Sequence, residues 1–444
     1  MNRQLAQRQW FDDILAQNSQ RIAESDQVWL NETRQQACER IVHLPIPQRK
    51  QENWRYTNLA DLYANTFYSQ TAPVTALHEE DIEEWIYSPA DSYRLVFANG
   101  QCVPALSNIE LLPDTIKIGS LRAALSTDGD LVTEWLARSN SPDTDVFTEL
   151  NQALLNDGLF IHVAANVELA LPIEVVHLNF SIEHNTLSQP HSLVIVEDGA
   201  RVKLVERFIS TGDSTYFFNA VSQLFLGEHA ALQHYRLQDE SRHAHHLSRV
   251  AIQQHTASEY RSVNIATGSA WSRTDMQVGF TGPQASCDIE GVLTVGDAQY
   301  TDFHLDVRHS QPACRSRENF RGIVHGKGQA VFDGRVVVDK QAQKTDALLT
   351  NKNLLLCEDA EVDTKPQLEI YADDVKCGHG TTVGKLDPDQ IYYLRSRGMS
   401  KDAAQRMLCL GFAEQILSQV EDARLHEVIA AQVSSHIARL DEGV

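Results

Sequence analysis

A repeat of short strands and tight turns is the feature that most limits how this chain can fold. Between about residue 150 and residue 385, small turn sequences precede many short alternating runs. The alanines of these turns recur at similar intervals, in the pairs Ala200–Ala230, Ala230–Ala257, Ala257–Ala285 and Ala330–Ala360, with Ala298 interrupting the series. Such a long, nearly constant period is typical of a coil of several strands that stacks on the next coil.

Stacking of such coils buries one side of every strand. The pattern therefore predicts a mainly β chain whose core is a parallel β-helix or a related β-solenoid. A large β-sandwich is the alternative, because its strands also recur at short intervals.

Helical patterns flank this repeat on both sides. Trp10, Ile14 and Leu15 recur at helical spacing near the N-terminus, and such spacing is typical of an amphipathic helix. Asp81-Ile82-Glu83-Glu84-Trp85-Ile86 has the pattern of a further short helix. Asn99-Gly100 lies between two short apolar runs and predicts a β-hairpin.

The C-terminal segment has well-marked helix boundaries. Asp387-Pro388 supplies an N-cap with proline in the first turn, Gly398 follows the end of that helix, and Ser400 can cap the next one. A third helix is expected from about Glu421. We therefore expect an N-terminal helical and mixed region over 1–145, a β-helix core over 146–385 and a C-terminal helical region over 386–444.

The charge balance argues against two classes of partner. The 444 residues include 38 Lys and Arg and 60 Asp and Glu, which gives a formal net charge of -22. Such a field repels nucleic acid and anionic lipid, and no run of basic residues offsets it. No apolar stretch approaches the roughly 18 residues of a membrane span. We predict neither a nucleic-acid nor a membrane partner.

Cysteine usage predicts the compartment. The seven cysteines are odd in number and widely spaced, with no C-x-x-C pair, at Cys38, Cys102, Cys287, Cys314, Cys357, Cys377 and Cys409. This usage argues against a disulfide framework. The first residues, MNRQLAQRQWFDD, are polar and show no signal peptide. Together these observations predict a cytoplasmic protein.

The segment Asp373-Asp374-Val375-Lys376-Cys377-Gly378-His379-Gly380 holds the sharpest candidate site. In an extended strand, residues i and i+2 project to the same side, so Cys377 and His379 would project together, roughly 7 Å apart at their backbones. Thiolate and imidazole are both ligands for zinc or iron. Two ligands do not close a tetrahedral site, so others would come from elsewhere in the chain or from a partner. The alternative is a small buried Cys377 and a turn residue at His379.

Standard enzyme signatures are missing from the sequence. The stretch His379–Leu386 nearly matches a phosphate-binding loop, but His379 replaces the first glycine and Leu386 replaces the magnesium-binding hydroxyl residue. No G-x-S-x-G, H-E-x-x-H or G-x-G-x-x-G motif occurs. We therefore exclude ATP binding at this loop and expect no standard hydrolase or dinucleotide site.

Two polar clusters have structural interpretations that compete with functional ones. His243, His245 and His246 are interpreted as an exposed polar turn rather than a metal site. Asp306, Arg308, Asp333 and Arg335 lie in probable strands. A carbohydrate-active β-helix enzyme would use Asp and Arg in this way, whereas alternating charges on a solvated face explain them without any catalysis.

Long stretches of the C-terminal half resemble a known family. The matching text covers residues 304–356, the segment PQLEIYADDVKCGHGTTVG, and YYLRSRG, while ENWRYT resembles the family's N-terminal region. On these residues the chain resembles the SufB and SufD proteins of the Suf iron–sulfur cluster assembly system. The form of the V-K-C-x-H-G motif and the moderate length look like the SufD branch. Thr381, Cys357 and Leu349 depart from the common family residues, and none of them is a candidate ligand.

The resemblance implies a right-handed parallel β-helix flanked by helical regions. It implies a non-enzymatic scaffold that pairs with a SufB-like paralogue through the β-helix and with the ATPase SufC through the C-terminal helices, around residues 387–430. It allows a homodimer when the chain is alone. It also implies that Cys377 and His379 bind iron or an iron–sulfur cluster that is transient and shared with a partner. A structural adaptor with no metal role remains the alternative within this family.

Overall fold

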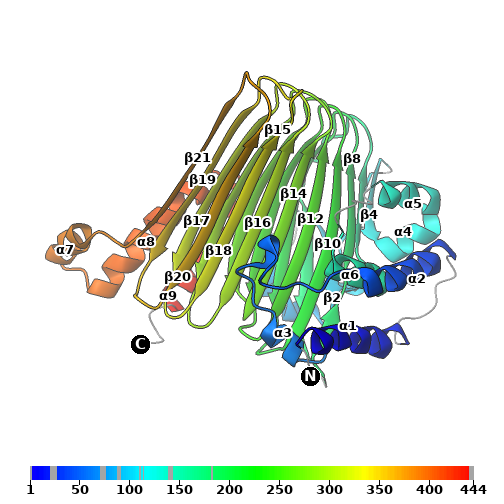
Figure 1. Cartoon of the computed structure of the whole chain (residues 1–444), viewed down its shortest axis with the longest axis horizontal. Helices are drawn as coiled ribbons and strands as arrows, with labels where there is room; N and C mark the ends of the chain where they lie inside the picture. The colour runs from blue at the N-terminus through cyan, green and yellow to red at the C-terminus, as the bar shows by residue number, and fades with distance from the viewer. Residues whose placement is uncertain are drawn as a thin grey trace.

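The computed structural model describes residues 3–20, 28–70, 77–87, 92–109, 112–113, 115–138, 144–181 and 184–439. Two large, mainly parallel sheets face each other along one long stack of coils, with helices at both ends of the chain (Figure 1). The chain passes from one sheet to the other and back, so that neighbours within each sheet are mostly every second strand in sequence. The predicted mainly β fold with a parallel β-helix core is confirmed.

The described strands fall into one sheet of eleven and one of ten. The first sheet contains β1 (Tyr68–Ser69), β4 (Ile116–Ser120), β5 (Leu159–Val163), β7 (Thr186–Ser188), β8 (His191–Val196), β10 (Tyr216–Leu226), β12 (His245–Gln254), β14 (Trp271–Phe280), β16 (Tyr300–His309), β18 (Gln329–Val338) and β20 (Glu361–Ile370). The second contains β2 (Tyr93–Ala98), β3 (Gln101–Cys102), β6 (Ile173–Asn179), β9 (Arg201–Ser210), β11 (Ala231–Glu240), β13 (Glu259–Gly268), β15 (Ser286–Val295), β17 (Arg315–Val324), β19 (Asp346–Leu355) and β21 (Lys376–Gly384).

The coil length agrees with the period in the sequence. Strand partners in successive coils recur at the interval of the turn alanines, as for Ala231 with Glu259 and for Trp271 with Tyr300. The predicted turns are also present. The residue that turns the chain from the first sheet to the second has a positive φ in six successive coils, at Gly199, His229, Ala257, Gln284, Ala313 and Lys344. Each of these residues donates its backbone N–H to the turn of the next coil.

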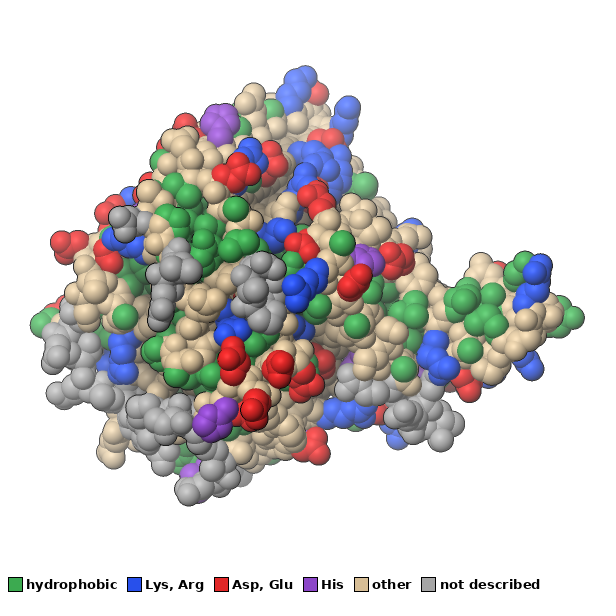
Figure 2. Space-filling model, turned by 180° about the vertical axis from the view of Figure 1, so that it is seen from behind, with side chains coloured by type: hydrophobic (Ala, Val, Ile, Leu, Met, Phe, Trp, Pro, Cys, Tyr) green, Lys and Arg blue, Asp and Glu red, His purple; other side chains and the backbone are tan. Residues whose placement is uncertain are grey.

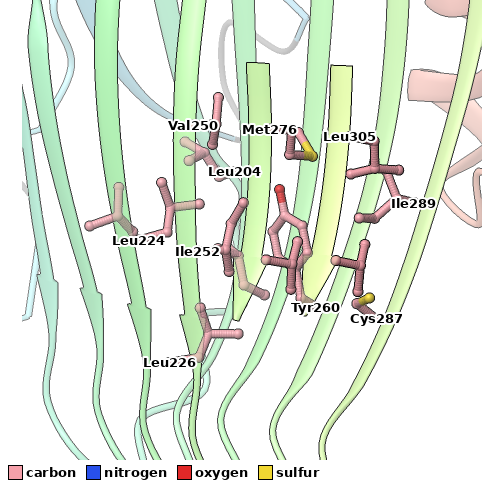
Figure 3. Packing of buried hydrophobic residues seen from close by; sticks show 14 of the residues in the cluster. Leu204, Leu224, Leu226, Val250, Ile252, Tyr260, Met276, Cys287, Ile289 and Leu305 are labelled. Atoms are coloured by element: carbon pink, nitrogen blue, oxygen red, sulfur yellow. The ribbon is translucent and has the colours of Figure 1, made fainter. Parts of the chain in front are cut away.

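Apolar side chains fill the space between the two sheets. Figure 3 shows Leu224 and Ile252 from the first sheet facing Leu204, Tyr260 and Ile289 from the second. In-register pairing places inward residues of successive coils above one another, so each residue packs on its counterparts in neighbouring coils. This stacking makes the interior continuous along the whole helix.

Helices close the N-terminal end of the stack. They are α1 (Arg3–Ser19), α2 (Val28–His43), α3 (Ala60–Ala64), α4 (Leu121–Thr127), α5 (Gly129–Ala137) and α6 (Val146–Ala153). The hairpin predicted at Asn99-Gly100 is confirmed, since β2 and β3 pair antiparallel on either side of it. The predicted helix at 81–86 is shorter than expected, because the chain forms two separate 3-10 turns, Glu79–Asp81 and Glu83–Trp85.

The C-terminal helices of the described chain are α7 (Pro388–Ser396), α8 (Lys401–Leu417) and α9 (Ala423–Arg439). Two of them, α8 and α9, pack back on the outside of the ten-stranded sheet. Asp387 and Ser400 cap α7 and α8 as expected, and Gly398 follows α7 with a φ of 94°. The buried faces of α8 and α9 cover an apolar strip of the sheet that includes Val263 and Val292. By contrast, α7 projects from the body (Figure 1) and has no buried residue.

The predicted exposure of the histidine cluster is wrong for two of its three members. His245 and His246 are each 2% exposed, and only His243 lies in an exposed turn. The Nε2 atom of His245 lies 2.8 Å from Asp61, and the Nδ1 atom of His246 lies 2.8 Å from Glu240 inside the helix. Strand alternation separates these two rings, so they do not form a metal site.

None of the helices in the described ranges has the length and apolar character of a membrane span.

The close packing of the interior can be tested by a substitution at Gly291. A Cβ atom at Gly291 would collide with the Phe320 ring, which is held between the rings of Phe303 and Phe332 at 4.6 and 4.8 Å. We expect Gly291→Ala to lower the free energy of unfolding by about 1–3 kcal/mol through overpacking, as measured by denaturant titration. Gly119→Ala is the control, since its added Cβ atom meets nothing within 4 Å. Equal midpoints for both variants would contradict this packing.

A buried ionic cluster gives a second test. Inside the helix the carboxylate of Glu206 lies 2.7 Å from His234, 3.4 Å from His177 and 3.7 Å from Arg236. Burial alone would raise the pKa of Glu206, but the hydrogen bonds from the two histidines hold it well below its usual range. Folding therefore favours the charged form of this carboxyl group.

We expect Glu206→Gln to lower the free energy of unfolding by about 3–5 kcal/mol at pH 7, because it leaves the buried guanidinium of Arg236 without its counter-charge. Stability from a depressed carboxyl pKa is present at neutral pH and is lost as the pH falls through the folded-state pKa. The difference from the unchanged chain should therefore shrink in acid, as followed by denaturation at several pH values. Glu259→Gln, at an exposed position on β13, should have little effect at any pH.

Candidate functional site at the open end of the β-helix

The two ends of the β-helix differ in how they are closed. At the start, β4 pairs antiparallel with β5, β3 pairs antiparallel with β2, and helices cover the outside. At the other end, the sheets stop at β20 and β21, and in the described part of the chain no strand pairs with their outer edges. An uncovered strand edge is a template for pairing with another chain.

Apolar side chains are exposed at this open end. Ile370 is 41% exposed, Tyr371 62% and Val383 46%. The last strands carry inward side chains that a further coil would cover, and Thr364 and Thr381 face each other across the end with their hydroxyl oxygens 3.1 Å apart. The final coil therefore has the surface of an interior layer rather than that of a finished cap.

The structure places Cys377 and His379 together on the inner side of the last strand. Cys377 is in register with Ala347, and His379 is in register with Leu349, and both of these partners are core residues. Cys377 is half-buried and packs against this core, whereas His379 is exposed at the open end. The two side chains thus project to the same side of β21, as the i and i+2 spacing predicts.

The surroundings of Cys377 favour its neutral thiol. Burial raises the pKa of this thiol, and the nearby carboxylates of Asp346 and Glu318 act in the same direction, while a hydrogen bond from the Ala347 backbone opposes them. The thiolate is the form that binds a metal. A cation delivered to this end would therefore compete with a proton for the sulfur.

Cys377 and His379 do not form a complete metal site within the described chain. No group of three or more His, Cys, Asp and Glu side chains among the described residues is arranged to hold a metal ion. A closed tetrahedral site needs four ligands. The remaining ligands of any metal bound here would have to come from another molecule.

Sequence reasoning missed the carboxyl group of Glu318. This residue is in register with Leu349, and Leu349 is in register with His379, so Glu318 faces the interior two coils below the open end. Burial raises its pKa to about 8, although the neighbouring Ser316 hydroxyl and the charge of Arg317 lower it. Its place in R-S-R-E-N-F, two residues before the inward Phe320, was the available signal.

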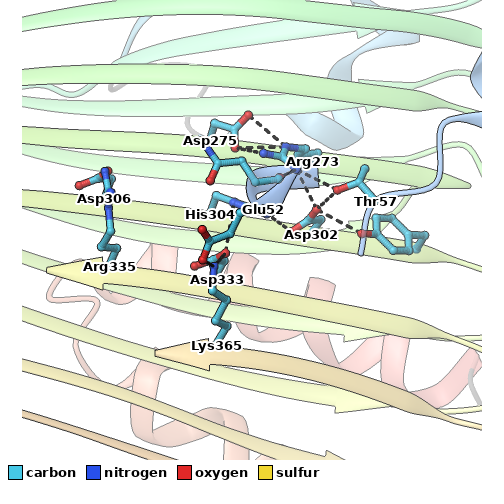
Figure 4. Close-up of polar contacts among 12 residues, drawn as sticks. Glu52, Thr57, Arg273, Asp275, Asp302, His304, Asp306, Asp333, Arg335 and Lys365 are labelled. Atoms are coloured by element: carbon cyan, nitrogen blue, oxygen red, sulfur yellow. Dashed lines mark hydrogen bonds and ion pairs between the residues drawn. The ribbon is translucent and has the colours of Figure 1, made fainter. Parts of the chain in front are cut away.

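The strand-borne Asp and Arg residues form ion pairs on the outer face of the first sheet. The Nε atom of Arg335 donates to Asp306 at 3.0 Å, Arg308 lies 3.1 Å from Asp339, and Asp333 accepts from Lys365 at 3.2 Å. Figure 4 shows Asp306 against Arg335 and Asp333 against Lys365 on neighbouring strands. These contacts agree with the interpretation of alternating charges on one face.

The ENWRYT segment crosses the same face and is held by a buried arginine. The guanidinium of Arg273 lies 4.0 Å from the centre of the Trp54 ring and donates to the hydroxyl of Thr57 at 2.8 Å. Thr57 in turn donates to the buried Asp302 at 2.8 Å (Figure 4). Glu52 reaches Lys365 on β20 at 2.8 Å. This segment thus fastens the N-terminal region to the last coils.

Comparisons with known proteins agree over nearly the whole chain. Residues 179–412 match the family model described as SUF system FeS cluster assembly, SufBD core domain, and residues 5–175 match the SufBD protein N-terminal region. An iron–sulfur cluster assembly SufBD family protein of Synechocystis is 33% identical over 90% of this chain and 89% of its own length.

Two relatives that bear the name iron–sulfur cluster assembly protein SufD also match. The one from Escherichia coli is 32% identical over 91% of this chain and 92% of its own length, and the one from Bacillus subtilis is 27% identical over 88% and 90%. On the family models and these identities, the chain belongs to the SufBD family of the Suf iron–sulfur cluster assembly system.

Proposed function

We propose that this protein is a scaffold component of the Suf complex and acts without catalytic chemistry of its own. It would pair with a SufB-like paralogue and a SufC-like ATPase, and a nascent iron–sulfur cluster would form between the β-helix subunits as cargo. The observation that carries this proposal is the open end, where Cys377 and His379 share the inner side of β21, whose outer edge pairs with no strand in the described ranges. The seven free cysteines suit a reducing compartment, and we place the activity in the cytoplasm.

The open end suits a paralogue with the same fold. A second β-helix that offered its own edge strands would satisfy the outer backbone groups of β20 and β21. It would also cover the exposed Ile370, Tyr371 and Val383. In that complex His379 would become buried, and the partner would provide the ligands that this chain lacks.

The C-terminal helices suit the ATPase. The apolar contacts of α8 and α9 with the ten-stranded sheet hold them in place, whereas α7 projects and exposes Tyr392 (75%) and Tyr393 (55%). Arg397 donates to the hydroxyl of Tyr393 at 3.0 Å and fixes its orientation. Tyrosine side chains presented in this way are common anchors in protein interfaces.

The same sheet would link the two interfaces. The α8 helix packs on β15 and β17, and the sheet then continues through β19 to β21. Movement of the ATPase subunits would pull on α7 and α8 and so strain the strands that end at Cys377 and His379. Nucleotide chemistry would belong to the partner, in keeping with the incomplete phosphate loop at 379–386.

Co-purification tests the proposal directly. The tagged chain would be expressed without oxygen beside a SufB-like paralogue and a SufC-like ATPase, and the eluate measured by native mass spectrometry. We expect one copy of this chain with one paralogue and two ATPase subunits. Recovery of the chain alone, or only as a homodimer, would overturn the scaffold proposal.

His379→Ala tests the ligand role. Loss of one ligand should reduce the iron and sulfide retained by the purified complex by about tenfold or more, while native mass spectrometry still finds the same subunits. Cys377→Ser should act in the same direction. His243→Ala, at an exposed turn far from β21 in sequence, is the control. Unchanged iron and sulfide in the His379 and Cys377 variants would instead support an adaptor without a metal role.

Tyr392→Ala combined with Tyr393→Ala tests the ATPase interface. Removal of both exposed rings should weaken ATPase binding by about tenfold or more, measured by surface plasmon resonance, and should leave paralogue binding unchanged. Tyr371→Ala at the open end should show the reverse pattern. If both variants affected both partners equally, the assignment of two separate interfaces would fail.

A further inference from the structure

A cleft of about 590 Å³ lies between the outer face of the ten-stranded sheet and the C-terminal end of α8. Strands β13, β15, β17 and β19 form its floor, and Ser418, Gln419 and Glu421 form one wall. This volume is within the range of small-molecule sites. The cleft lies away from the open end and from the exposed tyrosines of α7, although its wall belongs to the C-terminal region proposed to bind the ATPase.

Two cations stand side by side on the floor of this cleft. Arg321 on β17 is in register with Lys352 on β19, so their side chains leave adjacent strands on the same outer face. Both residues line the cleft. Like charges directly opposite each other across two strands are destabilising. An anion bound between them would remove that repulsion.

Neither cation makes an ion pair within 4.0 Å with a described residue of the cleft, although the charge of Glu290 acts on Arg321 and raises its pKa against the effect of burial. Lys352 has no hydrogen-bond or ion-pair partner within the described ranges, and the Nε atom of Arg321 is buried without a hydrogen-bond partner among the same residues. The other arginines of the cleft differ, since Arg315 pairs with Asp288 at 3.0 Å and Arg261 pairs with Glu421 at 3.0 Å. The positive charges and N–H donors of Arg321 and Lys352 are therefore available to a bound anion.

The orientation of Arg321 is fixed by its surroundings. Arg321 is only 4% exposed. Its guanidinium lies 4.7 Å from the centre of the Phe412 ring, and one of its Nη atoms donates to Gln415 of α8. A guanidinium held in this way loses little freedom when it binds an oxyanion. Thr350, two residues before Lys352, lines the same cleft and adds a hydroxyl donor.

One carboxyl group opposes an anion at this position. Glu290 on β15 lines the cleft, and burial together with the neighbouring Asp288 raises its pKa to about 7, although a hydrogen bond with Asn319 and the charge of Arg321 lower it. It makes no ion pair with Arg321 within 4.0 Å. The negative charge of Glu290 is therefore reduced at neutral pH, and its removal should favour an anion.

We propose that this cleft binds a phosphate group, free or carried on a small organic molecule, between Arg321 and Lys352. Figure 2 shows Lys and Arg side chains, with Asp and Glu side chains among them, at the upper right of the face that carries the C-terminal helices. Planar guanidinium groups and ammonium groups are the usual protein donors to phosphate. Because the residues that follow α8 line the cleft and Gln415 of α8 accepts from Arg321, a bound phosphate would tie this helix to the strands that lead to the open end.

Isothermal titration calorimetry with the full chain tests the site. Inorganic phosphate and adenosine monophosphate would be titrated at constant ionic strength and pH 7.5, and we expect a dissociation constant of about 1 mM or tighter for at least one of them. Binding of the ester at least about tenfold tighter than inorganic phosphate would identify an organic phosphate as the ligand. Equal affinities would identify free phosphate.

Three variants separate this site from general electrostatics. Lys352→Gln and Arg321→Gln should each weaken phosphate binding about tenfold, whereas Lys327→Gln removes an exposed charge in a turn and should not. Glu290→Gln should strengthen binding by about threefold, a gain that partial unfolding would not produce. The absence of measurable binding, or equal losses in the Lys327 and Lys352 variants, would overturn the proposal.

Discussion

In-register parallel pairing between successive coils is the constraint on which the rest of the structure depends. Each inward residue packs on the same position of the next coil, as along Tyr260, Cys287, Ser316, Ala347 and Cys377. Because the strands stay in register, coils can differ in length only in their turns. The positive-φ residues at the corners allow these tight turns, and their backbone N–H groups bond one turn to the next. A shift by one residue in any coil would turn its core side chains outward and its charged side chains inward.

The same stacking explains why the molecule has a functional end. Each end of a β-helix leaves strand edges unpaired and inward side chains uncovered, so each end must be covered by other elements or by another molecule. The chain covers the first end itself with antiparallel strands and helices. At the other end it exposes a complete inner layer, in which Cys377 and His379 occupy positions that are core residues one coil earlier. The candidate ligands are thus interior side chains of a last coil on which no strand of the described chain stacks.

Sequence could predict the parts of this structure that repeat. The coil period, the turn sequences and the helix caps at Asp387 and Ser400 are local signals, and the structure confirms each of them. The side on which Cys377 and His379 project also follows from spacing alone. The burial of His245 could not be inferred in this way, because the groups that contact its ring, Asp61 and Phe67, lie in a distant part of the chain. Glu318 was missed although its spacing of two residues from Phe320 placed it on the inner face, because a carboxyl group is not expected among core residues.

The cleft that holds Arg321 and Lys352 could not be predicted from the sequence. A search for runs of Lys and Arg finds none, because alternation sends neighbouring residues of a strand to opposite faces. Stacking then brings together cations that lie one full coil apart in the sequence, such as Arg321 and Lys352, and places α8 over them. In a parallel β-helix a charged surface is assembled across coils rather than along the chain. A chain with a large negative net charge can therefore carry a local phosphate site, and the relevant sequence pattern is one residue per coil at the coil period.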